Sequence, residues 1–258
     1  MYFHGAPGSP EEADLFRASA TANGLRVFCQ DRFAIDASLD PEAYFQVLAD
    51  DIIVQAKGQK IDVLGFSVGA FVALQVCRRI PAQVRSLHLV SPAAPLEGGN
   101  FLDGMAGKVV FQMARKTPWL FKLLSYWQGI LARLAPGFLF FTLFASAQAA
   151  DKTLSGNTSF RSQISEILVQ CFRGGVAGYI RDVRAYVHPW HDDLQEIKVP
   201  THLWHGEQDN WSPIAMSEYL RQQLPNVKSF TRMPRMSHYS CLYAAAPEIC
   251  SALQPAAV

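Results

Sequence analysis

Residues 61–74 are IDVLGFSVGAFVAL, an apolar stretch in which glycines stand two positions before and two positions after Ser67. Residues 61–66 have the length and apolar character of a buried strand, and residues 69–79 have those of a helix. The segment between them fits the pattern G-x-S-x-G, which holds a serine on a strained turn where its hydroxyl projects above a sheet. The flanking strand and helix favour a nucleophilic Ser67 over a glycine–serine turn that arose by chance.

Outside this stretch, short apolar runs alternate with helical segments, which is typical of βαβ units around a parallel sheet. Asp40 is the expected cap of one of these helices, with Pro41 at its first position. We expect strands at residues 1–4, 25–29, 61–66, 84–90, 201–204 and 227–233, and helices at 10–23, 40–57, 69–79, 213–224 and 239–253. The sequence therefore predicts an α/β fold with a mostly parallel sheet.

The alternation stops between residues 96 and 187, where the chain is helical and strongly apolar without a convincing strand. We therefore predict a discontinuous core, residues 1–95 and 188–258, with a helical lobe inserted at residues 96–187. Residues 134–150 are the least polar part of the lobe, but Pro136-Gly137 interrupts them and they are too short for a confident membrane span.

The overall composition fits a folded enzyme and excludes several other classes. Half of the residues are hydrophobic and the net charge is +1, so no global charge points to nucleic acid. Five cysteines without CxxC spacing, and a start that lacks a secretory signal, favour reduced thiols in a cytoplasmic protein. The sequence has no metal-ligand cluster, phosphate loop or nucleotide fingerprint, so we expect neither a cofactor nor a metal.

A nucleophilic serine needs a base and an orienting acid, which on a parallel sheet follow later strands in the order serine, acid, histidine. Residues 203–209, LWHGEQD, form a strand end, a glycine turn and an acid. Asp209 is the preferred acid, although it could instead cap the next helix and leave the role to Glu207. Residues 233–238, MPRMSH, end the next strand and offer His238 as the base, although it could instead be a surface residue that caps the last helix. Both candidates lie at the edge of the sheet that carries Ser67.

The other six histidines are weaker candidates for the base. His205 precedes the acid and so violates the expected order. His4 belongs to the loop at residues 4–8, and His88 and His202 fall inside strands, where they are expected to be core or packing residues. His188 and His191 flank Pro189-Trp190 where the lobe returns to the core, and they are expected to be structural or to line a mouth.

Acyl transfer also needs two backbone N–H groups that bind the oxyanion of the tetrahedral intermediate. Val68 directly follows the serine and is the first expected donor. The loop at residues 4–8, HGAPG, is expected to supply the second from Ala6, because Pro7 has no N–H.

Taken together, the segments at residues 4–8, 65–69, 204–209 and 237–238 resemble those of α/β-hydrolase-fold proteins, and the likeness covers nearly the whole chain. The resemblance implies Ser67 as nucleophile, Asp209 as acid, His238 as base, and the Ala6 and Val68 amides as the oxyanion hole. It also implies that the lobe is a lid or cap over the site. A serine in the turn argues against the dehalogenase and epoxide hydrolase branches, which use aspartate there.

The chain departs from that family in two places. Two strands usually precede the His-Gly loop, whereas here Met1 stands almost on it, which a misplaced gene start would also explain. The sheet should then expose the edge at residues 25–29, where a homodimer could form. The family also often has glycine before the catalytic histidine, and this chain has Ser237.

The lobe carries the information about substrate and partners. Between Asp103 and Asp151 it has no acidic residue, and its aromatic side chains either pack it onto the core or line an apolar tunnel for an acyl or aromatic group. Its basic and aromatic surface could also contact an anionic membrane. We therefore expect a small hydrophobic acyl or aromatic substrate.

Three functions compete at this point. The leading one is hydrolysis of an ester or thioester through an acyl-serine. The same triad supports hydrolysis of a carbon–carbon bond beside a ketone. A degenerate hydrolase used as a binding protein is the third, although such a protein would not require all the triad and oxyanion positions.

Overall fold

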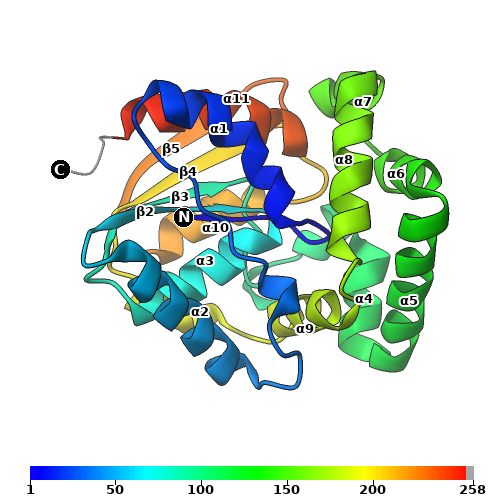
Figure 1. The fold of residues 1–258 in the computed structure, drawn as a ribbon, viewed down its shortest axis with the longest axis horizontal. Coiled ribbons are helices and arrows are strands. Elements are labelled where there is room, and N and C mark those ends of the chain that lie inside the picture. Colours follow the sequence, from blue (N-terminus) through cyan, green and yellow to red (C-terminus); the bar gives the residue numbers. More distant parts are fainter. Residues whose placement is uncertain (254–258) are drawn as a thin grey trace.

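The computed structural model describes residues 1–253, and the last five residues of the predicted core, 254–258, lie outside that part. Five parallel strands form one sheet in the order of the chain (Figure 1). They are β1 (Tyr2–Phe3), β2 (Ile61–Phe66), β3 (Val84–Val90), β4 (Thr201–Gly206) and β5 (Val227–Met233). The register pairs Phe3 with Gly65, Phe66 with Val90, and Val90 with Trp204. The carboxyl ends of the strands therefore meet at one edge.

Helices cover both faces of the sheet, as predicted. On one face α1 (Asp14–Ala22), which follows a 3₁₀ turn at Pro10–Ala13, packs against α11 (His238–Ala252). On the other, α2 (Pro41–Ala56) packs against α3 (Val68–Arg79) (Figure 1). The side chain of Asp40 accepts from the Ala43 amide at 2.9 Å, which confirms it as the cap of α2.

The predicted strand at residues 25–29 is wrong. This segment makes a single parallel bridge, from Cys29 to Tyr2, and otherwise has no ladder. The reason is that the neighbouring strand β1 is only two residues long and cannot form a ladder. The hydrogen bond between the two segments runs from the Tyr2 amide to the Phe28 carbonyl at 2.8 Å. Val27 and Phe28 are both more than one-third exposed beside β1.

Only helices occur between β3 and β4. After two 3₁₀ turns they are α4 (Lys108–Lys116), α5 (Pro118–Leu134), α6 (Pro136–Phe144), α7 (Ala149–Ser155), α8 (Thr158–Cys171) and α9 (Ala177–Val187). In Figure 1 helices α4 to α8 stand on the right, on the side to which the strands point. Glu97 Oε1 joins the two ends of this lobe, because it accepts from the amides of Trp190 at 2.6 Å and His191 at 2.8 Å. None of the helices within residues 1–253 is long and apolar enough to cross a membrane.

A buried ion cluster fastens α9 to the core. Asp182 accepts from Arg32 Nε at 2.6 Å and from Arg181 Nη2 at 3.0 Å, and its side chain is fully buried. Arg181 in turn donates to the Arg32 carbonyl at 2.7 Å and lies 3.5 Å from the centre of the Tyr44 ring. A single carboxylate therefore compensates two buried guanidinium groups.

We expect Asp182→Asn to lower the free energy of unfolding by about 3–5 kcal/mol, because it leaves Arg32 and Arg181 buried without a counter-charge. Urea denaturation measures this. The matched control is Asp14→Asn, which breaks the exposed ion pair with Arg17 and should barely move the urea midpoint. Equal midpoints for Asp182→Asn and the unmodified protein would contradict the prediction.

Candidate active site

Ser67 occupies a strained turn between β2 and α3, with φ 55° and ψ −127°. A non-glycine residue in this region of backbone conformation costs of the order of 1–3 kcal/mol, and such strain is concentrated at functional sites. The turn is held by hydrogen bonds from the Ser67 amide to the Val90 carbonyl at 3.2 Å and from the Ala93 amide to the Ser67 carbonyl at 3.1 Å. Both partners belong to β3 or the loop after it, so the neighbouring strand fixes the conformation of the serine.

The two glycines of the pattern are required by close backbone contacts. A Cβ atom on Gly69 would lie 2.3 Å from the Phe3 carbonyl oxygen and 2.2 Å from that of His4. A Cβ on Gly65 would lie 2.6 Å from the Cα of Ala70. Any side chain at either position would therefore push apart β1, β2 and α3 at the turn that presents Ser67.

Asp209 and His238, predicted from different segments of the sequence, come together after β4 and β5. Asp209 Oδ2 accepts from His238 Nδ1 at 2.7 Å, and both side chains are buried. The Asp209 Oδ1 atom accepts from the amides of Trp211 at 2.8 Å and Ser212 at 2.9 Å. The carboxylate is thus fixed on both sides, and it fixes the imidazole in turn.

The electrostatics keep this carboxylate ionised. Burial alone would raise the pKa of Asp209, but the adjacent His238, its hydrogen bond and the Ser212 amide outweigh burial and lower the pKa below the usual value. His238 Nε2 is buried and has no hydrogen-bond partner in residues 1–253. That nitrogen is therefore the one available to a serine hydroxyl.

Aromatic rings enclose His238 at the end of β2. The ring of Phe66, the residue before the serine, lies 4.6 Å from the imidazole centre. Trp211 stacks on the imidazole with an interplanar angle of 11° at 5.5 Å. These contacts hold the imidazole against the end of β2, directly before the serine turn.

Ser237, which departs from the family pattern, fits its position. Its amide donates to Ser240 Oγ at 2.8 Å at the start of α11. The close approach of this loop to β4 is provided by Gly206 instead, where a Cβ would lie 2.4 Å from the Ser237 carbonyl oxygen. The serine therefore does not obstruct the placement of His238.

Glu207 and His205, the alternative site residues, each have partners other than His238. Glu207 is partly exposed and pairs with Arg232 at 3.3 Å, away from His238. His205 Nε2 lies 3.5 Å from Asp209 Oδ2, but both of its ring nitrogens have hydrogen-bond partners, Nδ1 with Ser217 Oγ and Nε2 with the Ser212 carbonyl, each at 2.7 Å.

The histidines of the strands are packing residues, as predicted. His88 on β3 stacks on His202 of β4 at 4.7 Å, and burial lowers the pKa of His88 to about 4.

The loop at residues 4–8 lies directly against the serine turn. A Cβ on Gly5 would be 3.7 Å from that of Ser67. The Gly5 amide donates to Glu12 Oε2 at 2.9 Å, and the Gly5 carbonyl accepts from Arg32 Nη2 at 3.0 Å. Two buried charged side chains therefore hold the backbone next to Ala6, and Val68 presents its amide from the first turn of α3. Neither Glu12 nor Arg32 belongs to a recognisable sequence motif, since each stands in a short 3₁₀ turn.

Asp151 on α7 is a further residue that sequence reasoning missed. Its fully buried carboxylate accepts from the amides of Tyr239 at 2.9 Å and Ser240 at 2.7 Å, in the first turn of α11. Burial raises the pKa of Asp151, and the hydrogen bonds from Ser240 and Tyr239 oppose that rise. The lobe thereby anchors the helix that begins with His238. The sequence carried one signal: Asp151 is the first acidic residue after Asp103.

We expect Asp151→Asn to lower kcat by about 10- to 100-fold with little change in KM for a short ester, because a small shift of His238 disturbs proton transfer. Steady-state kinetics at constant pH measure this. The matched control is Asn157→Ala, which removes the cap on the Phe160 amide of α8 and should affect stability but not kcat. An unchanged kcat in folded Asp151→Asn would contradict the prediction.

Part of the aromatic set of the lobe packs onto the core beside the site. Phe144 of α6 lies 5.3 Å from Trp211 and 5.4 Å from Tyr239, ring centre to ring centre. Phe160 of α8 lies 5.8 Å from Tyr239. Other aromatic residues of the lobe, including Trp119 and Trp127, are exposed. The expectation of packing is therefore confirmed for some of these side chains only.

A cavity of about 740 Å³ lies away from these residues. Its lining includes Met1, Asp62 and Arg85, which stand at the amino ends of β1, β2 and β3. Ser67 follows the carboxyl end of β2, so this cavity is at the opposite edge of the sheet from the serine.

Comparison with known proteins agrees with this geometry. A family model described as the alpha/beta hydrolase fold matches residues 1–245. The chain belongs to the α/β hydrolase fold family. A comparison with curated protein sequences found no match.

Solved structures similar to this α/β hydrolase have the same fold at low sequence identity. A bromoperoxidase from Bacillus anthracis is 17% identical with a TM-score of 0.66, over 96% of this chain and 87% of the other. An esterase from Exiguobacterium antarcticum is 15% identical with a TM-score of 0.64, over 97% and 91%. A serine hydrolase from the polyaromatic hydrocarbon-degrading bacterium Cycloclasticus zankles is 16% identical with a TM-score of 0.61, over 96% and 86%.

Proposed function

We propose that this α/β hydrolase is a serine hydrolase that cleaves an ester or thioester of a hydrophobic acyl group through an acyl-serine. The observation that carries the proposal is the buried 2.7 Å hydrogen bond from His238 Nδ1 to Asp209, which leaves Nε2 free beside the strained Ser67 turn. A base, an orienting acid and an activated serine at the carboxyl edge of a parallel sheet are what acyl transfer needs.

In the first half of the proposed reaction, Ser67 Oγ attacks the carbonyl carbon while His238 Nε2 accepts the hydroxyl proton. The negative charge on the carbonyl oxygen is stabilised by the Ala6 and Val68 amides. Asp209 stays ionised and stabilises the imidazolium. Collapse of the intermediate breaks the bond to the leaving oxygen or sulfur, which takes the proton from His238, and leaves an acyl-Ser67.

In the second half, water attacks the acyl carbon as His238 accepts its proton, and the same two amides stabilise the second oxyanion. Collapse releases the acid and returns the proton to Ser67. The ester and one water molecule are the only reactants in these two halves.

A fluorophosphonate probe and an ester series test the proposal. The probe should add one phosphonyl group to Ser67, located by peptide mass spectrometry. Specificity constants for aryl esters should rise from acetyl to decanoyl, by up to about fourfold for each methylene that is buried against the aromatic side chains. A folded protein that neither reacts with the probe nor hydrolyses any ester would overturn the proposal, and equal rates on acetyl and decanoyl esters would overturn the acyl preference.

A further inference from the structure

One side of the lobe exposes an unusual number of large apolar side chains. Among residues 1–253, nine of the fourteen large hydrophobic residues that are exposed lie on α4, α5 and α6. Eight of them form what we call the α5–α6 face, each between 52% and 80% exposed: Trp119, Leu123, Tyr126, Trp127, Ile130, Leu134, Phe138 and Phe141. Soluble monomeric proteins rarely expose so many large apolar side chains side by side, and an extended exposed patch of this kind marks an interaction site.

The six residues of this face on α5 form one stripe. At roughly 100° per residue, their positions fall within an arc of roughly 100° around the helix axis. The opposite side of α5 is already buried in the lobe by Phe121, Ser125 and Ala132. The stripe is therefore not the surface by which α5 packs into the protein. Within residues 1–253 it stays exposed to solvent.

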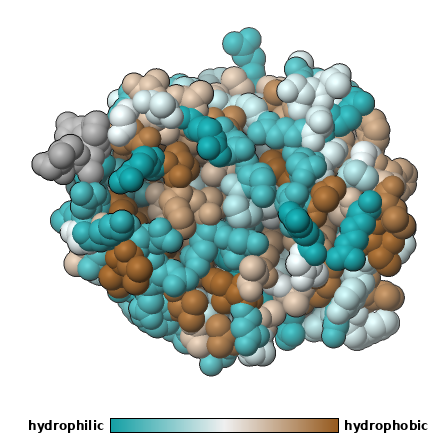
Figure 2. Space-filling model, viewed as in Figure 1, coloured by the Kyte–Doolittle hydropathy of each residue, from teal (hydrophilic) through white to brown (hydrophobic). Residues whose placement is uncertain are grey.

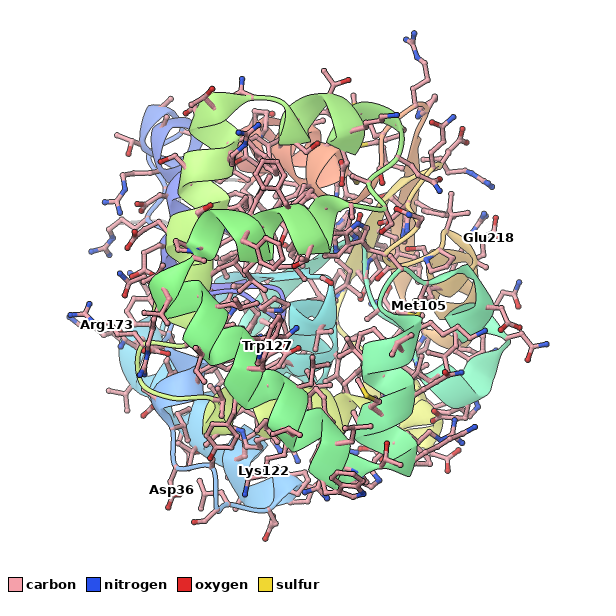
Figure 3. All side chains as sticks on the ribbon, turned by 90° about the vertical axis from the view of Figure 1, so that its right-hand side faces the viewer. Asp36, Met105, Lys122, Trp127, Arg173 and Glu218 are labelled. Atoms are coloured by element: carbon pink, nitrogen blue, oxygen red, sulfur yellow. The ribbon has the colours of Figure 1, made fainter. Side chains whose placement is uncertain are left out.

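The view in Figure 3 is directly onto this side of the molecule. Helix α5 crosses the front, with Lys122 and Trp127 labelled on it. In Figure 2 hydrophobic side chains gather at the right-hand edge, where Figure 1 places α5 and α6. The face is thus built from the outer sides of helices at one end of the molecule.

The charge of this region is mainly positive, and one of its lysines, Lys108, pairs with Asp103 just outside it at 2.7 Å. Residues 104–150 contain five lysines and arginines and no aspartate or glutamate, although the chain as a whole has a net charge of +1. Lys116 at the end of α4 and Lys122 near the start of α5 are exposed, and Arg133 near the end of α5 donates to the Phe172 carbonyl at 3.3 Å. Helix α8 beside them is balanced, with Arg161 and Glu166. The cations therefore border the aromatic stripe without acidic neighbours in the same helices.

We propose that the α5–α6 face binds the surface of an anionic lipid bilayer, with α5 lying along it. Tryptophan and tyrosine rings prefer the level of the lipid headgroups, and lysines beside them are attracted to anionic lipids. A protein partner fits less well, because lysine is depleted at protein–protein interfaces. Since no helix of the described residues can cross a membrane, the contact is peripheral.

Helix α6 contributes to the α5–α6 face with its outer side and contacts the candidate active site with its inner side. Phe138 and Phe141 of α6 point outward, whereas Phe140 and Phe144 are buried, and Phe144 contacts Trp211, which stacks on His238. Binding through this face would hold the site close to the layer in which hydrophobic acyl esters dissolve. The binding itself does not depend on the reaction proposed for Ser67.

Vesicle sedimentation tests the proposal with the whole protein. We expect at least roughly tenfold tighter binding to vesicles of phosphatidylcholine mixed with phosphatidylglycerol than to phosphatidylcholine alone, and weaker binding as salt is added. The emission of Trp119 and Trp127 should shift to shorter wavelength on binding. An absence of sedimentation with the anionic vesicles, or equal binding to both kinds, would overturn the proposal.

Variants locate the contact. The double variant Trp119→Ser/Trp127→Ser should bind anionic vesicles at least roughly tenfold more weakly while its urea midpoint stays unchanged, since both rings are exposed. Lys116→Gln/Lys122→Gln should reduce anionic binding toward that of neutral vesicles. The matched control is Val54→Ser on α2, which is 75% exposed outside this face and should bind normally. If the tryptophan variant instead converts a lipid-free dimer to a monomer without altering vesicle binding, a second copy covers the face and the proposal fails.

Discussion

Replacing Ser67 with alanine is expected to lower kcat on an aryl ester by about a millionfold. Without Oγ there is no acyl-enzyme, and what remains is the effect of the oxyanion donors and of substrate binding. The fold should be nearly unaffected, because alanine keeps the Cβ and the strained backbone with φ 55°. Steady-state hydrolysis and urea denaturation on the same preparation separate these two quantities.

Two further substitutions make this result specific to the serine. Ser67→Gly should be equally inactive but somewhat more stable, since glycine relieves a backbone strain of the order of 1–3 kcal/mol. Ser125→Ala removes a buried hydroxyl on α5 that donates to the Phe121 carbonyl at 2.8 Å, and should keep kcat within about tenfold. Hydrolysis by Ser67→Ala at more than a few per cent of the normal rate would show that another group is the nucleophile.

The serine turn was predictable because its sequence signal is local, although Val90, Ala93 and the carbonyl of His4 hold it from other segments. A strand, a five-residue turn and a helix follow one another within twenty residues. Gly65 and Gly69 mark the positions where neighbouring backbone leaves no room for a side chain. Asp209 and His238 were found by the same logic, since each follows a strand that could be recognised from its apolar residues. Their hydrogen bond was an expectation from the order of the triad, and the structure shows the pair in contact at 2.7 Å. The catalytic roles stay predictions until the kinetics are measured.

Asp151, Arg32 and Asp182 could not be predicted, because their contacts join segments that are far apart in the sequence. Asp151 meets α11 across 88 residues of sequence, and Arg32 meets Asp182 across 150. A single charged residue in a helix or turn gives no periodic signal, and its burial depends on tertiary packing. The segment at residues 25–29 failed in a related way: its apolar residues indicate a strand, but a two-residue neighbour cannot provide a ladder.

Asp209→Asn is expected to lower kcat by about 10⁴-fold. The surroundings of this residue dictate the orientation of the new amide. Because the amides of Trp211 and Ser212 donate to Oδ1, the asparagine oxygen must stay on that side, and its NH₂ group then faces His238. His238 Nδ1 can meet an NH₂ group only as an acceptor, which places the imidazole proton on Nε2. That nitrogen can then no longer take the proton of Ser67.

Glu207→Gln is the matched control, because it makes the same chemical change two residues away in the same turn. Glu207 pairs with the partly exposed Arg232, so this variant should keep kcat within about threefold. Comparable losses in both variants would show that the turn, and not the tautomer of His238, was disturbed. A normal rate for Asp209→Asn would show that Asp209 does not orient the base.

Acid stability provides a second readout for Asp209. Its pKa in the folded protein is lowered, whereas an aspartate in an unfolded chain titrates near about 3.9. The ionised carboxylate therefore adds stability that is fully present above that value and is lost as the pH falls through the lower, folded pKa. Asparagine cannot titrate, so between neutral pH and pH values below about 3.9 the Asp209→Asn variant should lose less stability than the unmodified protein. Urea midpoints over this range measure the difference, and parallel curves would mean that the buried carboxylate is not held ionised by His238.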